Sequence, residues 1–308
     1  MTRISTSHGY SIVLSDLMKA TNAERAAGQQ VSSGRTADSL RGFAPDVEQL
    51  LAARSVKVRT EGYLDQGKLI VSRLEAQDLA LRETANAADS ARNSIAEALA
   101  SDRGDTLMGE LAGHFLTASE ALNTQQGGRY LFAGAQINTR PVDATSLSQL
   151  TAVADVAEVF RNDALKPVSR LDDYNTIESG FLADEEGTGL FTAFRDVQAY
   201  VEANGGFSTP LTAPQKAFLE GMLGAFDAAN KSLTDAASLN GAHQTRVDNA
   251  LAQHEARDAL LSGEISDIAE VDMAEAITRL QQAQTAVQAS AQVFATLRDN
   301  SLLTLLRS

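Results

Sequence analysis

The sequence predicts a mainly α-helical protein in which long N- and C-terminal helices form a coiled-coil-like bundle, with a smaller β-rich or mixed insertion in the middle. The first observation is where proline occurs. Four of the five prolines lie between residues 141 and 214, and the fifth is Pro45. Because proline breaks helix interiors, we expect long helices near the two ends and not in the middle. The second observation is composition: with 5% aromatic residues and no tryptophan, the apolar side chains are mostly small and aliphatic, which suits helix packing.

The first helix is predicted over about residues 11–32. Apolar and small residues recur there at alternating steps of three and four, which is the spacing of one helix face: Leu17, Ala20, Glu24, Ala27 and Val31. Gly34 follows as a plausible helix stop, and we expect a loop over residues 34–44.

The second helix is predicted to start at Pro45, with Asp46 and Glu48 near the positive end of the helix dipole. Its later part carries the clearest pattern in the chain, with steps of four and three that predict a heptad seam: Ile70, Leu74, Gln77, Leu81, Thr84, Ala88, Ala91, Ile95 and Ala98. We expect this helix to pause at residues 102–105 and to resume over 106–126.

Helix is expected again after a capping box formed by Thr212 and Gln215, with a break near Asn240 and Gly241. A second line with the same spacing predicts a C-terminal seam: Met273, Ile277, Leu280, Gln284, Val287, Ala291 and Phe294. Four leucines near the end form an apolar surface that we expect to be buried against something: Leu302, Leu303, Leu305 and Leu306.

The predicted organisation has three parts. Residues 1–33 and 275–308 would be terminal inner coiled-coil segments, and residues 34–134 and 210–274 a helical bundle domain. Residues 135–209 would be an outward-facing β-rich or mixed lobe, because glycine pairs and short apolar runs replace the helical periodicity there. The terminal seams could pack within one molecule or against neighbouring subunits, and the two readings are compatible.

Composition excludes several classes of function. The net charge of −14 gives no positive field of the kind that nucleic-acid binding needs. The absence of cysteine excludes disulfides and thiolate catalysis. We find no apolar run long enough to span a membrane and no cleavable secretory signal, so we expect no membrane insertion and, if the chain is exported, another export route.

No motif points to catalysis. His243 and His254 would share a helix face but lie about 16 Å apart, too far to hold one metal ion. The Gly187–Gly189 stretch lacks the third glycine of a dinucleotide fingerprint, and acidic clusters such as Asp172–Asp173 are those of solvated loops. We therefore predict that the protein is not an enzyme and has no catalytic residues, no cofactor and no metal.

Several segments resemble flagellins and flagellar hook-associated proteins. These are residues 3–6 (Arg-Ile-Ser-Thr), residues 31–35 (Val-Ser-Ser-Gly-Arg), residues 267–280 and the leucine-rich ending. Residues 127–134 (Gly-Gly-Arg-Tyr-Leu-Phe-Ala-Gly) are similar to a motif of the hook-associated protein 3 family, the hook–filament junction proteins. Residues 36–43 depart from the acidic Asp-Asp patch that flagellin relatives usually carry there.

The resemblance implies a structural subunit that joins the flagellar hook to the flagellin filament by docking of coiled-coil helices. It implies extracellular location on the bacterial flagellum, reached as an unfolded chain through the flagellar type III pathway. The implied partners are the junction protein on the hook side, flagellin on the filament side, copies of the chain itself in a ring, and a cytoplasmic export chaperone.

The residues expected to carry this role are the seam positions and the family motif. The seam set is Leu17, Val31, Ile70, Leu74, Leu81, Ile95, Met273, Ile277, Leu280, Val287, Phe294 and the four terminal leucines. The motif set is Arg129, Tyr130, Leu131, Phe132 and Gly134. Two alternatives stay open: a flagellin filament subunit, and a surface adhesin or carbohydrate-binding flagellin homologue. Exposed aromatic side chains in the middle lobe, at Phe181, Phe191, Phe194 or Tyr200, would favour the latter.

Overall fold

The computed structural model describes the backbone of residues 2–306 and the side chains of His8 and of residues 11–297. The chain divides into two compact units, which we describe separately. The terminal unit comprises Met1–Glu61 and Ala256–Ser308, and the central unit comprises Gly62–Glu255. The predicted mainly α-helical class with a small mixed insertion is confirmed, whereas the predicted three-part division stays a prediction.

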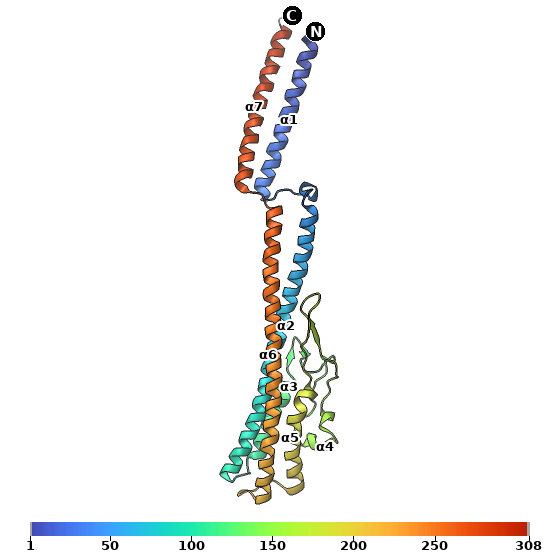
Figure 1. Cartoon of the computed structure of the whole chain (residues 1–308), viewed down its shortest axis with the longest axis vertical. Coiled ribbons are helices and arrows are strands. Elements are labelled where there is room, and N and C mark those ends of the chain that lie inside the picture. The colour runs from blue at the N-terminus through green and yellow to red at the C-terminus, as the bar shows by residue number, and fades with distance from the viewer. Residues whose placement is uncertain (1, 307–308) are drawn as a thin grey trace. The chain divides into compact units, whose positions relative to one another are not determined.

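In the terminal unit, helices α1 (Thr2–Ser33) and α7 (Met273–Leu306) run side by side (Figure 1). Helix α1 therefore begins well before the predicted residue 11. It stops as predicted at Gly34, which adopts a left-handed φ of 68° and donates its N–H to the carbonyl of Gln30. The connection to the next helix holds a short 3₁₀ helix, Leu40–Phe43, whose buried Phe43 packs with Leu50 and Ala269.

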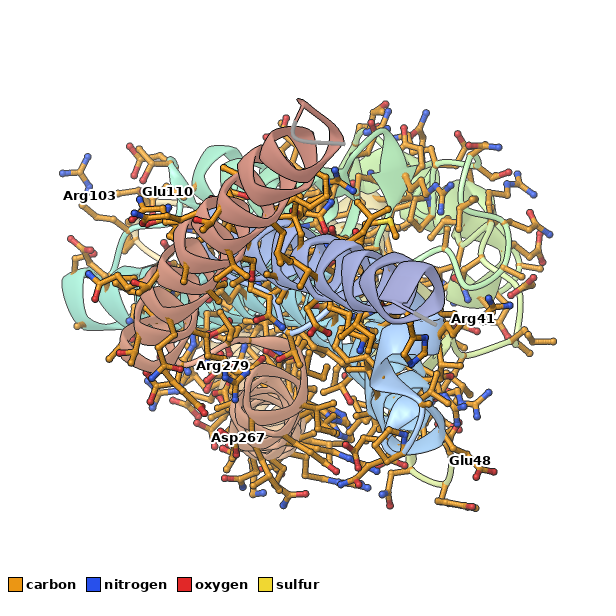
Figure 2. All side chains as sticks on the ribbon, turned by 90° about the horizontal axis from the view of Figure 1, so that it is seen from above. Arg41, Glu48, Arg103, Glu110, Asp267 and Arg279 are labelled. Carbon is orange, nitrogen blue, oxygen red and sulfur yellow. The ribbon has the colours of Figure 1, made fainter. Side chains whose placement is uncertain are left out.

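Two further long helices, α2 (Val47–Ser101) and α6 (Ala213–Ala269), each contribute residues to both units. Helix α2 begins two residues after Pro45, the predicted first helical position. In the terminal unit, Lys57 of α2 pairs with Asp258 of α6 at 2.7 Å. Glu48 on α2 and Asp267 on α6 are exposed and point outward (Figure 2).

The central unit is built on the heptad seam of α2, and all nine seam residues from Ile70 to Ala98 are buried there. Helices α3 (Leu107–Leu122), α5 (Ala183–Asn204) and α6 supply the other walls of the core. Edge-to-face aromatic contacts link them, with ring centroids 5.0 Å apart for Phe194 and Phe226 and 5.8 Å apart for Phe115 and Phe194. The break after α2 falls at residues 102–105 as predicted, with Asp102 at a left-handed φ of 57°.

The smaller elements of the central unit form the mixed insertion. Two antiparallel hairpins pair β1 (Gln125–Gln126) with β2 (Arg129–Tyr130), and β3 (Val168–Arg170) with β4 (Thr176–Glu178). A short helix α4 (Leu147–Ala152) and a 3₁₀ helix (Val156–Val159) lie between the hairpins in sequence. Helix α3 thus ends at Leu122 rather than at residue 126, because residues 125–130 form the first hairpin instead.

Two sequence expectations about helix are wrong. Helix α5 has 22 residues and lies in the middle, where no long helix was expected. The prolines at 167 and 210 flank it, so the segment between them is free to be helical, and it buries Leu190, Phe194 and Val197 on one face. The break predicted at Asn240 and Gly241 is absent, since α6 runs through both residues. Asn240 is fully buried and donates from Nδ2 to the carbonyl of Leu74 at 2.8 Å, and packing here outweighs the roughly 1 kcal/mol that glycine costs a helix.

The predicted capping box at the start of α6 is confirmed. The N–H of Thr212 donates to Oε1 of Gln215 at 3.0 Å, and the N–H of Gln215 donates to Oγ1 of Thr212 at 3.4 Å. The same Gln215 side chain donates to the carbonyl of Gly206 at 3.3 Å, so it also holds the incoming loop.

The first hairpin carries the motif at residues 127–134. Gly127 and Gly128 form its two-residue turn with φ of 58° and 78°. A type I′ hairpin turn requires such positive φ values at both central residues. Gly134 ends the motif at a φ of 67°, and a Cβ placed there would lie 3.0 Å from the carbonyl oxygen of Asp163 and collide with its Oδ1. The glycines of this motif are therefore fixed by backbone geometry.

We predict that Gly134→Ala destabilises the protein by on the order of 1–3 kcal/mol, because it adds both a strained left-handed residue and a steric clash. Gly189→Ala is the matched control, since Gly189 is helical, exposed and has open space around it. The control should gain about 0.5–1 kcal/mol from helix propensity. Urea unfolding followed by circular dichroism measures both, and equal effects of the two substitutions would contradict the assignment.

We also predict a pH-dependent stability that depends on Glu186. Its burial, aided by the neighbouring Glu185, raises the pKa of Glu186 from 4.5 to about 7, although Lys166 opposes the shift. Because the pKa of Glu186 is raised in the folded state, its protonated carboxyl contributes stability to the fold that is fully present below about pH 4.5. This contribution is lost as the pH rises through about 7. Glu186→Gln should therefore raise the Tm at about pH 8 and change it little at about pH 4. Glu120→Gln, at an exposed position of α3, should do neither.

Candidate assembly surfaces

The terminal helices α1 and α7 meet along one line on each helix. On α1 this line contains the predicted residues: Ala27 is buried, and Leu17, Ala20, Glu24 and Val31 are half-buried. On α7 the inward line holds Ala276 and Ala283, which are buried, and Leu280, Val287 and Phe294, which are half-buried. Gly28 of α1 faces Leu280 of α7, and a Cβ at this position would make an ordinary van der Waals contact of 3.9 Å with its Cδ1.

The predicted C-terminal seam is therefore split between two faces of α7. Leu280, Val287 and Phe294 face inward, whereas Met273 and Ile277 are 43% and 42% exposed. Gln284 and Ala291 are exposed as well. The structure adds Ala276 and Ala283 to the face of α7 that meets α1. The sequence pattern missed these alanines because Met273 and Ile277, their neighbours, form a second apolar line with the same spacing.

Large apolar side chains also face outward on α1. Ile12, Leu14 and Met18 are 48%, 41% and 55% exposed. A shallow groove of about 480 Å³ runs between α1 and α7, and most of the residues that line it are alanines. The lining residues are Ala23, Ala26, Ala27, Gln30, Arg279, Gln282, Ala283 and Ala286. Arg279 of α7, labelled in Figure 2, is paired with Glu275 at 2.5 Å. Small side chains in such a groove leave room for the side chains of another helix.

The predicted seam residues of α2 are placed differently. Ile70 and Leu74 lie in a core with Leu171, Ile177 and Val247. Leu81 and Ile95 lie in the main core of the central unit, and both are fully buried. These four side chains therefore stabilise the single chain and offer no surface to a neighbour. The side chains of the last candidates lie outside the described residues: Leu302, Leu303, Leu305 and Leu306.

The family motif residues border a second surface. Leu131, Phe132 and Gly134 are buried, Tyr130 is half-buried and Arg129 is exposed. Beside the hairpin lies an open cavity of about 890 Å³, formed by α2, the β1–β2 hairpin and residues 165–169. We call it the hairpin pocket. Its lining residues lie far apart in the sequence, so no sequence pattern indicated it.

Two guanidinium groups lie in the hairpin pocket, those of Arg73 and Arg129. Arg73 is half-buried and donates from Nη2 to Oγ of Ser179, while its Nε is buried without an acceptor in the described part of the chain. Burial lowers the pKa of Arg73 below its usual range. None of the residues that line the pocket is an aspartate or a glutamate. The pocket can therefore accept an apolar group that carries negative charge nearby.

Other sites are limited to what the described residues show. They contain no cluster of three or more His, Asp or Glu side chains that could hold a metal ion. No helix among them is both long and apolar enough to cross a membrane. The aromatic residues whose exposure would indicate a carbohydrate-binding surface are inward: Phe181, Phe191 and Phe194 are buried, and Tyr200 stacks on Phe207 and Phe218.

Comparisons with known proteins agree with this architecture. Residues 223–306, which cover most of α6 and α7, match the model of the bacterial flagellin C-terminal helical region. A solved structure assigned as a flagellar hook-associated protein from Vibrio parahaemolyticus is similar, with a TM-score of 0.61 and 16% identity over 74% of this chain and 100% of that chain.

A crystal structure of FlgL from Bacillus cereus aligns with a TM-score of 0.49 and 11% identity, over 73% of this chain and 99% of that chain. A search of curated proteins gave no match. The resemblance to flagellin-like hook-associated proteins is confirmed: residues 223–306 are similar to the bacterial flagellin C-terminal helical region, and the chain shares its fold with the Vibrio protein.

Proposed function

We propose that this protein is a structural subunit of the bacterial flagellum and that it joins the hook to the flagellin filament. The observation that carries the proposal is the flagellin C-terminal helical region at residues 223–306, whose final helix α7 pairs with α1 and leaves apolar side chains outward. A structural role accords with a surface of helices and grooves. The cysteine-free composition suits a chain that is exported unfolded.

The mechanism is docking of helices into grooves of neighbouring subunits. Fully burying one exposed large aliphatic side chain stabilises a contact by roughly 1.5–3 kcal/mol. Met18, Met273 and Ile277 are about half exposed, so each would contribute part of that amount when a partner covers it. The alanine-lined groove between α1 and α7 allows a partner helix to approach closely. The terminal leucines would extend the same apolar surface.

The partners that follow are the hook-associated junction protein on the hook side, flagellin on the filament side and further copies of this chain in a ring. A cytoplasmic chaperone would hold the C-terminal region before export through the flagellar type III pathway. The protein would then lie outside the cell, on the flagellum, and would act without catalysis or a cofactor.

A flagellin filament subunit is the second candidate, because the matched family model is that of flagellin itself. Self-polymerisation separates the two roles. A flagellin extends filament seeds on its own, whereas a junction protein does not. The adhesin reading has lost its support, since the aromatic residues that would favour it face the core.

A deletion strain tests the junction role directly. Deleting the gene should leave hooks without filaments and should release flagellin monomers into the medium, because filament growth then lacks its base. Electron microscopy of hooks and immunoblots of the medium measure both outcomes. Full-length filaments on the deletion strain would contradict the junction role. Hooks without filaments and without flagellin in the medium would favour the flagellin alternative.

We predict that removing residues 302–308 leaves the protein exported but unable to join hook and filament, because the proposed docking surface loses its four terminal leucines. Complementation of the deletion strain with the shortened gene measures joining, and the medium shows whether the chain was exported. Leu260→Ser is a control, since Leu260 is 73% exposed on α6 and belongs to neither α1 nor α7. Strains that swim with full-length filaments on the shortened chain would exclude a docking role for the tail.

A further inference from the structure

We infer that the hairpin pocket of one copy receives the tip of the β3–β4 hairpin from a second copy of this chain. The inference rests on the proposed function in that it names one contact between copies in the proposed ring. The pocket and the tip both belong to the central unit, so the argument uses that unit alone.

The charge of the pocket is opposite to that of the chain. The whole sequence has 40 acidic and 26 basic residues, yet the pocket lining holds Arg73 and Arg129 and no carboxylate. No ion pair joins either guanidinium to an acidic side chain within the described part of the molecule. Charges of one sign in a partly buried site favour a partner of the other sign, since their interaction is screened less than on an open surface.

The rim of the pocket is apolar and unusually exposed. Leu69, Leu165 and Val168 line it and are 74%, 66% and 61% exposed, although each is a large aliphatic residue. Its floor includes the buried Ile70 and Leu131. A cavity of about 890 Å³ with such walls has room for an aromatic side chain and the turn that carries it.

The tip of the β3–β4 hairpin presents a matching group. Tyr174 is 95% exposed, the highest value among the exposed large hydrophobic side chains of the described residues. Asp172 and Asp173 precede it directly in the sequence. Arg170 donates to the carboxylate of Asp173 at 3.2 Å, so the tip keeps a net negative charge of one from these three groups. An aromatic ring beside a negative charge suits an apolar pocket with guanidinium groups.

The tip is held in one conformation before any contact forms. The Asp172 carboxylate accepts the N–H groups of Tyr174 and Asn175, each at 2.7 Å, and Nδ2 of Asn175 at 2.5 Å. These hydrogen bonds, that of the Asn175 side chain foremost, hold the pKa of Asp172 below its usual range. A preorganised loop loses little conformational entropy on docking, which favours its use as a contact.

The tip cannot serve the pocket of its own chain. The hydroxyl of Tyr63 on α2 donates to Oδ1 of Asp173 at 2.7 Å, and the buried His254 ring contacts the carbonyl of Leu171 at 3.0 Å. The tip is thus anchored at the level of Tyr63, and Arg73 lies ten residues along the same helix, about 15 Å away. A second copy must supply the tip that fills the pocket.

Such a contact joins different surfaces of two identical chains. Head-to-tail contacts of this kind leave one free tip and one free pocket on each pair, so they repeat and close into a ring or extend as a helix. This geometry accords with subunits that follow one another around a tubular structure.

Cross-linking on the cysteine-free chain tests the contact. We would mix purified Thr176→Cys and Ala135→Cys chains at high concentration and add a short bismaleimide, since Thr176 is exposed beside the tip, Ala135 is an exposed residue of the pocket lining, and Tyr174 stays in place. A cross-linked dimer with the tip and pocket peptides joined is expected. The matched control mixes Thr176→Cys with Ala228→Cys, an exposed position on α6 outside the pocket. Equal dimer yields in both mixtures would overturn the inference.

A charge substitution provides the second readout. Arg129→Glu should reduce the dimer yield at least several-fold, and added salt should reduce the yield of the unsubstituted pair. Arg140→Glu changes the net charge equally at an exposed position that does not line the pocket, and it should leave the yield unchanged. A loss that is the same for both substitutions would show a general charge effect and would contradict a contact at the pocket.

The double variant Thr176→Cys with Ala135→Cys identifies the source of the tip. Cross-links between chains support the inference, whereas an internal cross-link within one chain would show that the chain fills its own pocket and would overturn it. The result is independent of the deletion strain. If the deletion strain lacks filaments but no cross-linked dimer forms, the contact is wrong and the proposed function stands. If dimers form but the deletion strain has normal filaments, the contact stands and the proposed function is wrong.

Discussion

The buried seam of α2 is the contact on which the rest of the central unit depends. Residues from Ile70 to Ala98 present one unbroken line of side chains that α3, α5, α6 and the 171–177 region cover. Without this line the two hairpins would have no surface to pack on, because neither has more than three residues per strand. The pocket and the tip are therefore positioned by helix packing rather than by their own strands.

Polar groups fix how α2 and α6 align within the central unit. Asn240 donates to the carbonyl of Leu74 and Asn230 to that of Ala85, at 2.8 Å each, so the residue numbers on α6 fall as those on α2 rise. The amide of Gln77 is buried in the same seam without a partner among the described residues. A buried polar atom left unpaired costs on the order of 1–3 kcal/mol, so this seam is less stable than an all-apolar one and more selective about its alignment.

How far the sequence predicts the structure depends on how local the signal is. The seam of α2 follows from spacing because each buried residue lies three or four positions from the next. On α7 the spacing cannot choose between two adjacent lines, since Met273 and Ile277 are as apolar as the residues that face α1. The pocket joins Arg73, Arg129 and Leu165 across the chain, and such a meeting depends on the fold and not on any local pattern.

The difference between the two seams also separates folding from assembly. A helix in the centre of a bundle can bury most of its surface, as α2 does with Leu74, Leu81 and Ile95. Two helices paired with each other have a single shared line, and their outer faces stay open whatever their sequence. On α1 and α7 those outer faces carry Met18, Ile277 and other large apolar residues, where a helix that remained in water would carry polar ones. The α1–α7 pair is thus half of a core, and under the proposed function neighbouring subunits would supply the other half.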